Sequence, residues 1–192
     1  MNVEDESVTV TLRVVAELDR LGIDYFIGGS VASSVHGRPR TTDDVDLIAA
    51  IAGRQVESLV RGLEKEFYVD EDMVRDAVGR RASFNIIHLG TMLKVDVFVL
   101  GVEDFALEEM KRRSAVPLRG SRVWFSSPED TVLEKLDWFQ KGQGISERQW
   151  RDVLGVLAVQ GARLDLQYLR LWAARRGLLD LLQRALAEAS PA

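Results

Sequence analysis

The feature that most limits how this chain can fold is the stretch 25–48, YFIGGSVASSVHGRPRTTDDVDLI, in which two apolar runs flank a glycine pair and a polar turn. The first run ends at Gly28-Gly29-Ser30, and the second begins at Asp44-Val45-Asp46. Because a strand has a period of two, a strand from Asp44 places both aspartates on one face and Val45 on the other. The stretch therefore predicts a strand, a small helix and a second strand that presents two carboxylates.

A third aspartate, Asp96, stands further along the chain in the run Lys94-Val95-Asp96-Val97-Phe98. An acid within an apolar strand is costly to bury unless it is paired or bound to a cation. Taken singly, the other two features have plain explanations, since a glycine pair is common in strand-to-helix turns and an Asp-x-Asp can be a solvated strand end. The three together, each at the end of an expected strand, favour an active site.

This order of motifs resembles the nucleotidyltransferase superfamily whose core is shared with DNA polymerase β. Its members have a strand ending in Gly-Gly or Gly-Ser, then acid-hydrophobic-acid on the next strand, and a lone acid on a later strand. The form Arg40-Thr41-Thr42-Asp43-Asp44-Val45-Asp46-Leu47 is similar to small bacterial members, namely toxin-type enzymes of the AbiEii kind and the aminoglycoside or lincosamide nucleotidyltransferases. The resemblance covers residues 8–125 and fades beyond them.

The resemblance implies an α+β fold, in which a nucleotidyltransferase-like mixed β-sheet is flanked by helices and followed by a helical C-terminal part. Apolar periodicity predicts helices at 8–21, 31–35, 54–66, 72–78 and 103–111, and strands at 25–28, 44–51, 83–89, 92–100, 115–118 and 122–126. Ser30 is expected to cap the helix 31–35. The strands 83–89 and 92–100 are expected to form an antiparallel hairpin.

The pattern changes at Ser127-Pro128-Glu129-Asp130, which is typical of a helix start. The serine caps the helix, the proline stands where its missing N–H costs least, and the acids favour the positive first turn. Helical spacing then continues to the C-terminus and predicts about four helices. We therefore expect a nucleotidyltransferase catalytic core at 1–126 and a C-terminal helical region at 127–192.

The resemblance implies that Asp44, Asp46 and Asp96 are the catalytic residues and also the metal ligands. Related sites hold two magnesium ions about 3.5–4 Å apart, which activate the acceptor hydroxyl and hold the triphosphate. The chain has no cysteine and two histidines, so oxygen must supply most metal ligands. Oxygen ligands favour Mg²⁺, or Mn²⁺ as an alternative, over zinc. Asp96 is expected on the acceptor side, with a role as general base.

A nucleoside triphosphate is the expected substrate, with ATP favoured although no residue pattern identifies the base. Glycines let backbone N–H groups approach phosphate oxygens closely, and the helix that follows offers its positive N-terminus. Ser30 would add a hydroxyl donor, and Arg40, Thr42 and Lys94 are candidates because they stand beside the acids. Lys135 matches a lysine often found after a similar helix start in small family members. The nucleotide-binding candidates are Gly28, Gly29, Ser30, Arg40, Thr42, Lys94 and Lys135.

Several conspicuous side chains are expected to play no part in the chemistry. The two histidines lack evident partners, the tryptophans lie on helical apolar stripes typical of a core, and one aspartate alternates to the other strand face. These residues are His36, His88, Trp138, Trp150, Trp172 and Asp43.

Composition narrows the partners. The chain has 192 residues, is 46% hydrophobic and carries a formal net charge of −5, which weighs against broad nucleic-acid binding. No run approaches the roughly 18 apolar residues of a membrane span, and the start MNVEDESV is acidic where a signal peptide is basic. We therefore expect a cytoplasmic protein without membrane contact. Apolar helices near the C-terminus leave a homodimer open.

The reaction expected from the resemblance moves a nucleoside monophosphate from an NTP to an acceptor hydroxyl and releases pyrophosphate. The acceptor stays open among RNA such as tRNA, a protein and a small hydroxylated molecule, with the acidic charge slightly against RNA. The alternative is a catalytically silent nucleotide-binding member that acts as a sensor or as a toxin–antitoxin component. Presence of all three acids favours the enzyme.

Overall fold

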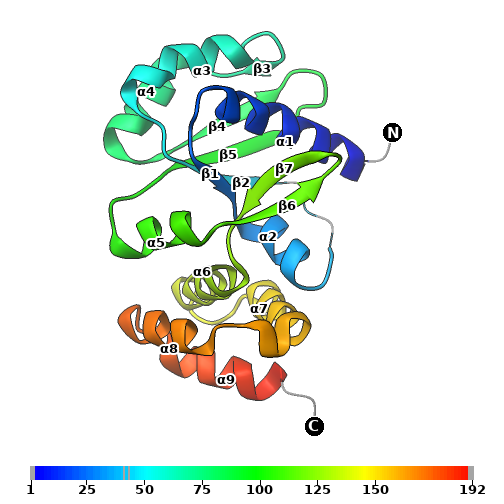
Figure 1. The fold of residues 1–192 in the computed structure, drawn as a ribbon, viewed down its shortest axis with the longest axis vertical. Helices are drawn as coiled ribbons and strands as arrows, with labels where there is room; N and C mark the ends of the chain where they lie inside the picture. Colours follow the sequence, from blue (N-terminus) through cyan, green and yellow to red (C-terminus); the bar gives the residue numbers. More distant parts are fainter. Residues whose placement is uncertain (1–2, 41, 43, 190–192) are drawn as a thin grey trace. The chain divides into compact units, whose positions relative to one another are not determined.

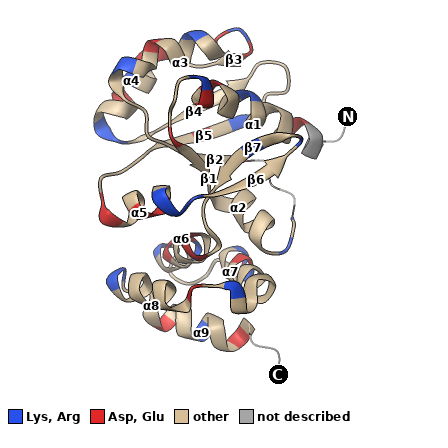
Figure 2. Cartoon of the chain, in the orientation of Figure 1, with Lys and Arg blue, Asp and Glu red and all other residues tan. Residues whose placement is uncertain are grey.

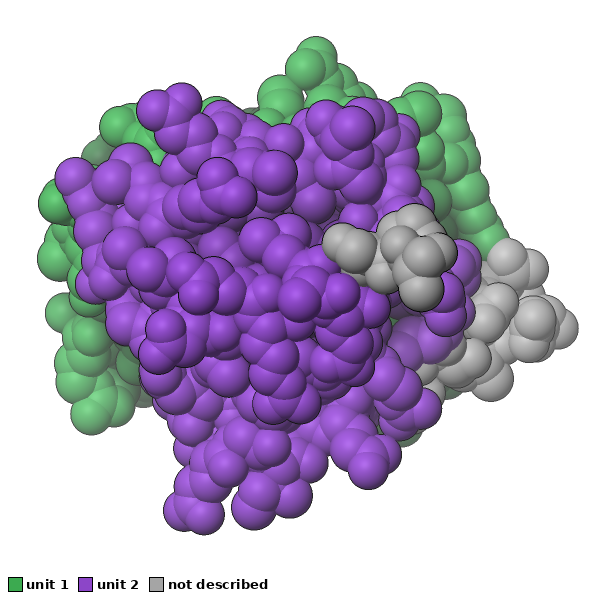
Figure 3. All heavy atoms as spheres, turned by 90° about the horizontal axis from the view of Figure 1, so that it is seen from below, with its two compact units in different colours: residues 1–28, 41–125 green, residues 29–40, 126–192 purple. Residues whose placement is uncertain are grey.

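The computed structural model describes residues 3–40, 42 and 44–189. It divides into two compact units, residues 1–28 with 41–125, and residues 29–40 with 126–192 (Figure 3). The chain thus passes between the units after residues 28, 40 and 125. The sequence predicted a single boundary after residue 126. In the structure the short segment 29–40 also belongs to the unit of the C-terminal helices.

The first unit is built on one mixed sheet. Within the described residues the sheet has seven strands in the order β3-β4-β5-β2-β1-β7-β6. The strands are β1 (Tyr25–Ile27), β2 (Val45–Ala49), β3 (Phe67–Tyr68), β4 (Ser83–His88), β5 (Lys94–Val99), β6 (Ser114–Leu118) and β7 (Ser121–Phe125). The pairs β2–β5 and β1–β7 are parallel, and the other pairs are antiparallel. The expected hairpin of β4 and β5 is therefore confirmed, whereas β3 was not expected.

One face of the sheet is mostly apolar. Along β2 the side chains Val45, Leu47 and Ala49 are buried, while Asp46 and Ile48 on the other face are partly exposed. The apolar face is covered by three helices, which lie together on one side of the sheet in Figure 1, with α5 on the other side. They are α1 (Val3–Arg20), α3 (Val56–Leu63), which follows a 3₁₀ turn, and α4 (Glu71–Arg80).

The opposite face carries an apolar cluster under α5. Helix α5 (Asp104–Arg112) packs Ala106 and Met110 against Phe26, Ile48 and Trp124. Asp46 lies two residues before Ile48 on β2, so it shares this face but lies beyond the apolar cluster. Asp46 and Asp96 are both partly exposed on this part of the face.

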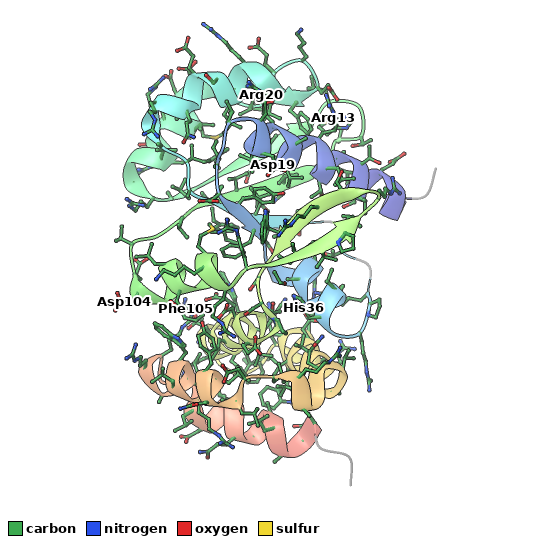
Figure 4. All side chains as sticks on the ribbon, in the orientation of Figure 1. Arg13, Asp19, Arg20, His36, Asp104 and Phe105 are labelled. Atoms are coloured by element: carbon green, nitrogen blue, oxygen red, sulfur yellow. The ribbon has the colours of Figure 1, made fainter. Side chains whose placement is uncertain are left out.

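Helix α1 begins at Val3, five residues before the start expected from periodicity. Val10, Val14 and Val15 are buried along it, so tertiary packing offsets the weak helix propensity of β-branched residues. Arg13 and Arg20, labelled in Figure 4, lie on the outer side of α1 and pair with Glu66 and Glu17.

Charged residues of both signs are intermixed on α3 and α4 (Figure 2). Arg61 pairs with Glu57 on α3, and Arg75 pairs with Glu71 on α4, each at i, i+4 spacing. Such exposed pairs contribute little stability, typically about 0–1 kcal/mol each. This side of the first unit therefore presents no field of a single sign.

The second unit is helical. It consists of α2 (Gly29–His36), α6 (Pro128–Lys141), α7 (Glu147–Gln160), α8 (Leu166–Arg175) and α9 (Leu179–Ala189). The expected cap of α6 is confirmed, because Ser127 Oγ accepts a hydrogen bond from the Asp130 backbone N–H at 3.1 Å. Ser30, expected to cap the small helix, instead lies within its first turn, because α2 begins at Gly29.

The tryptophan predictions are confirmed for two of the three residues. Trp150 and Trp172 are buried, but 55% of Trp138 is exposed, so the prediction that it belongs to the core is wrong. Trp138 follows Glu134 by one turn on the polar side of α6, and the Lys141 ammonium lies 5.6 Å from its ring centroid. Helical spacing alone did not separate this side from the buried one.

One face of α7 runs along the segment that follows α2. Gln160 Nε2 donates to the His36 carbonyl at 2.6 Å, and Asp152 pairs with Arg40. Between them, a Cβ on Gly37 would lie 2.8 Å from the Val156 backbone nitrogen. Because residues 152, 156 and 160 are four apart, they share one helix face. Segment 36–40 is therefore held directly against the α7 backbone.

The α+β architecture expected from the sequence is confirmed, with a mixed sheet, flanking helices and a helical C-terminal part. The second strand is shorter than expected and begins at Val45, so Asp44 stands immediately before it. Among the helices in the described part of the chain, none combines the length and apolar character needed to cross a membrane.

The close approach at Gly37 predicts a sharp effect of one methyl group. We expect Gly37→Ala to lower the free energy of unfolding by about 1–3 kcal/mol, because the added Cβ overlaps backbone atoms of α7 that cannot rotate away. Urea unfolding followed by circular dichroism measures the change. Gly79→Ala on α4 is the control: its Cβ would meet nothing within 4 Å, so a helix-favouring gain of about 0.5–1 kcal/mol is expected. Equal effects of the two changes would contradict the packing argument.

Candidate active site

The acidic group consists of Asp44, Asp46 and Asp96 in the first unit. Strands β2 and β5 are parallel, and their register places Asp46 directly beside Asp96. Neighbouring residues on adjacent strands point to the same face, with the strands about 4.8 Å apart. Asp44 is exposed immediately before β2. Two of the three predicted acids are thus brought together by strand pairing, and the third stands two residues from them.

A lysine supplies the counter-charge of the acidic group. Lys94 Nζ lies 2.9 Å from Asp96 Oδ2, and 41% of the Lys94 side chain is exposed. The hydrogen bond to Asp96 and its charge raise the pKa of Lys94, and the charges of Asp44 and Asp46 raise it further. One ammonium group therefore feels all three carboxylates. Lys94 was expected to contact phosphate, and the structure places it on a carboxylate.

Asn85 extends the acidic group along β4 and was missed by the sequence analysis. The antiparallel register pairs Asn85 with Asp96, so the amide lies on the same face as the carboxylate. Its neighbours Phe84 and Ile86 are buried on the opposite face. The alternation of polar and apolar residues in β4 indicated an exposed face, but no local pattern revealed which strand it would adjoin.

Gly28 and Thr42 shape the two chain segments that border the acidic group. The Gly28 N–H donates to the Asp46 carbonyl at 2.9 Å, which continues the pairing of β1 with β2 up to the glycine pair. A Cβ on Gly28 would lie 3.0 Å from Ile48 Cδ1, so little space is left for a side chain. Thr42 Oγ1 donates to the Asp44 carbonyl at 3.3 Å. Asp43, which was predicted to face away, lies outside the described residues.

The cationic cluster belongs to the second unit and consists of Ser30, Arg40, Lys135 and Asp152. Arg40 reaches both oxygens of Asp152, with Nε to Oδ1 at 2.9 Å and Nη2 to Oδ2 at 3.0 Å. Lys135 Nζ lies 2.8 Å from the same Oδ2. Both cations also donate to Ser30 Oγ, Arg40 at 2.6 Å and Lys135 at 3.5 Å.

The ion pairs of this cluster are buried, which strengthens the attraction between their charges. Only 5% of the Lys135 side chain and 7% of the Asp152 side chain are exposed. Burial alone raises the pKa of Asp152, but hydrogen bonds from Arg40 and Lys135 and their charges hold that pKa below its ordinary value. Two cations share one carboxylate, so the cluster carries a net positive charge. Ser30, Arg40 and Lys135 were predicted, whereas Asp152 was missed because a lone acid on a helix has no distinguishing pattern.

Gly29 opens α2 with a positive φ of 55°, a conformation that favours glycine. Its carbonyl accepts a hydrogen bond from Ser33 Oγ at 2.8 Å. The helix start therefore presents its first N–H groups from the same segment that carries Ser30, which is the arrangement expected for an anion-binding end.

The donor set of the acidic group fits a hard divalent cation. Carboxylate oxygens on two neighbouring strands, with Asp44 close in sequence, are the ligand type that Mg²⁺ and Mn²⁺ take. In the arrangement described for residues 3–40, 42 and 44–189, no three His, Asp or Glu side chains converge closely enough to hold an ion. Asp96 instead holds Lys94. The metal roles of the three aspartates stay a prediction.

Both histidines have structural partners. His36 is buried and its Nε2 lies 2.6 Å from the Ser126 carbonyl, so this nitrogen carries the hydrogen (Figure 4 labels His36 on α2). Burial lowers the pKa of His36, opposed by the Ser126 hydrogen bond and the charge of Glu129. His88 Nδ1 lies 2.8 Å from Thr91 Oγ1, and its ring meets Phe67 edge-on. These contacts agree with the structural roles expected for both residues.

Comparison with known proteins identifies the fold. No family model and no curated protein matches the sequence. An antigenic nucleotidyltransferase-like protein from Paracoccidioides brasiliensis is 20% identical, with a TM-score of 0.56, over 95% of this chain and 93% of that chain. The antibiotic-resistance factor ANT(2'')-Ia, in complex with adenylyl-2''-tobramycin, is 17% identical with a TM-score of 0.57, over 88% of this chain and 97% of that chain.

A lincosamide antibiotic adenylyltransferase, LnuA, bound to lincomycin, is 12% identical with a TM-score of 0.53, over 83% of this chain and 99% of that chain. At these identities the likeness shows the fold. The chain therefore has the nucleotidyltransferase fold, and the resemblance found in its sequence motifs is confirmed at that level.

The buried His36 predicts a pH-dependent stability. Because its pKa is lowered in the folded protein, the unfolded chain takes up a proton near the ordinary value of about 6.5 while the folded chain does not. Proton uptake by the unfolded chain favours unfolding, so stability falls as pH drops from 7 towards 5. We expect His36→Gln to lose less stability over this interval, measured by urea unfolding at each pH. Parallel losses in both proteins would contradict this assignment.

Proposed function

We propose that this protein is a metal-dependent nucleotidyltransferase, which moves a nucleoside monophosphate from an NTP to an acceptor hydroxyl and releases pyrophosphate. The observation that carries the proposal is the parallel register of β2 and β5, which sets Asp46 beside Asp96 on the sheet face opposite the apolar one. Two adjacent carboxylates repel each other, and such an arrangement is suited to binding cations. The fold supports the same class of reaction.

The acidic group is assigned to the reacting phosphate and the acceptor. Mg²⁺ or Mn²⁺ bound there would neutralise phosphate charge and lower the pKa of the acceptor hydroxyl. Asp44, Asp46 and Asp96 would hold it. Asp96 accepts the proton of the acceptor hydroxyl, whose oxygen bonds to the α-phosphorus as the bond to pyrophosphate breaks. Lys94 must leave Asp96 for this role, and its ammonium then suits a phosphate oxygen.

We assign the cationic cluster to the β- and γ-phosphates of the NTP, here called the triphosphate tail. Arg40 and Lys135 carry fixed positive charge, and Ser30 adds a hydroxyl at the start of α2. The backbone N–H of Gly29 is a further donor in this assignment, while Gly28, whose N–H is bonded to the Asp46 carbonyl, lets phosphate approach because it has no side chain. Thr42 has a hydroxyl that turns to the chain itself, so its part is to hold the turn before β2. ATP is the favoured triphosphate.

For the acceptor we favour a small hydroxylated molecule over RNA or protein. The structures of ANT(2'')-Ia and of the lincosamide antibiotic adenylyltransferase, whose chains are covered almost completely, have adenylyl-2''-tobramycin and lincomycin bound. The net charge of −5 is a further argument against a polyanionic acceptor. One fold serves many substrates, so the first test below follows the label into each class of acceptor.

The first test asks whether the acidic group supports chemistry. Radiolabelled NTPs are incubated with the protein, Mg²⁺ and either cell extract or hydroxylated antibiotics, and label is followed into RNA, protein and small molecules. We expect transfer to a small molecule, and a loss of at least about 10²-fold with Asp96→Asn, because removing one group that stabilises transition-state charge typically costs this much.

Asp180→Asn, an equal charge change at the start of α9, is the control and should leave transfer unchanged. Titration calorimetry of each NTP with Mg²⁺, for the native protein and Asp46→Asn, accompanies the assay. Binding of NTP without transfer to any acceptor would contradict the enzyme and favour a silent sensor or toxin–antitoxin component.

The second test concerns the competition between Lys94 and metal. Replacing Lys94 by methionine removes the ammonium group from Asp96, so we expect the affinity for Mn²⁺ alone to rise by up to about fivefold, the range of an exposed ion pair. Titration calorimetry with MnCl₂, without nucleotide, measures this. Lys111→Met, which breaks the exposed pair with Glu108 on α5, is the matched control. An unchanged or weaker affinity in Lys94→Met would exclude competition.

A further inference from the structure

Two cations in the cationic cluster converge on one hydroxyl, which is electrostatically unfavourable by itself. Arg40 Nη2 and Lys135 Nζ both donate to Ser30 Oγ. Like charges at such separations repel, and more strongly where side chains are buried. Asp152 lies against both cations, at 2.9 Å from Arg40 and 2.8 Å from Lys135. The carboxylate therefore makes this convergence of positive charge stable.

The geometry at Asp152 fixes direction as well as charge. Arg40 uses Nε and Nη2 in a two-point contact with the carboxylate, which sets the plane of the guanidinium group. Lys135 donates to the carboxylate oxygen Oδ2 and to Ser30. Because the Ser30 oxygen accepts from both cations, its own hydrogen is left to donate, which suits an anion.

Asp152 is held on a rigid support. It stands on the α7 face that carries Val156 and Gln160, and this face contacts segment 36–40 at the Gly37 close approach and at the His36 carbonyl. Arg40 ends that segment, so both the chain that bears Arg40 and the carboxylate that orients its side chain are fixed by one helix. Rigid secondary structure positions such groups better than loops.

We propose that Asp152 is the positioning residue of a triphosphate-tail site, holding Arg40 and Lys135 so that their N–H groups and the Ser30 hydroxyl converge on phosphate oxygens. This rests on the proposed function for the identity of the substrate, because the site is the one assigned above to the triphosphate. Asp152 itself does not touch phosphate, since a carboxylate and a phosphate repel each other.

For the variant Asp152→Asn, an orienting role and charge alone predict opposite changes in the affinity for an anion. Asp152→Asn removes a negative charge from the site, which by charge alone should strengthen anion binding. If Asp152 acts by orienting the cations, the affinity for inorganic tripolyphosphate should instead fall by about 10- to 100-fold, as metal affinity does when a metal-binding side chain loses its orienting partner. Titration calorimetry of the full chain with tripolyphosphate in EDTA measures this without metal, nucleotide or acceptor.

Asp152→Glu separates position from charge. It keeps the carboxylate but displaces it by one methylene, so we expect weaker tripolyphosphate binding with the net charge unchanged. Asp180→Asn repeats the charge change of Asp152→Asn outside the site and should bind as the native chain does. Circular dichroism and thermal unfolding of each variant show that affinities are compared between folded proteins. If Asp152→Asn does not fold, Asp152→Glu carries the test.

The outcomes are distinct. Tighter binding by Asp152→Asn, native affinity in Asp152→Glu, or no binding of tripolyphosphate by the native chain would each overturn the proposal. Weaker binding by Asp152→Asn and Asp152→Glu, with Asp180→Asn unchanged, supports it. Failure of the proposed function shows separately, as tripolyphosphate binding by a protein that transfers no nucleotide.

Discussion

The parallel pairing of β2 with β5 is the constraint on which the candidate chemistry depends. A shift of one residue in this register would move Asp46 away from Asp96 and turn one strand's apolar side chains out of the core. The buried residues Val45, Leu47 and Val97 on the opposite face oppose such a shift. Hydrophobic burial on one side of the sheet thus holds two carboxylates together on the other, although they repel each other.

Both charged groups keep one side chain of the opposite sign. Lys94 lies on the acidic group and Asp152 on the cationic cluster, and neither cancels the charge of its group completely. They differ in burial. Lys94 is partly exposed on a strand and can exchange its carboxylate for another partner at little cost, whereas Asp152 is almost wholly buried between two cations. The first is suited to yielding its place to a ligand, and the second to holding other groups still.

The local sequence pattern correctly predicted those features that depend only on neighbouring residues in the chain. Strand alternation placed Asp46 and Asp96 on polar faces, and the Ser127 cap followed from residue types alone. Register between distant strands is set by the whole sheet, so the contact of Asn85 with the Asp96 position could not be derived. Asp152 was missed for the same reason, because its partners come from α2, α6 and the segment after α2. Trp138 shows the converse error, in which a helical period was clear but the direction of its buried side was not.

The acceptor side of the acidic group can be argued from β4. On the face that Asn85 shares with Asp96, its neighbours along the strand are Ser83 and Ile87, so no arginine or lysine stands there on this strand. A phosphodiester backbone needs cations along its path, whereas hydroxyl groups pair with amides and hydroxyls that both donate and accept. Asn85 supplies a group of the second kind beside Asp96, the proposed proton acceptor, and Ser83 supplies another two residues along β4. Lys94 stands opposite Ile87 on β5, but its ammonium is bound to Asp96. The side chains of β4 are therefore in line with the small hydroxylated acceptor proposed above, on grounds separate from the likeness to antibiotic adenylyltransferases.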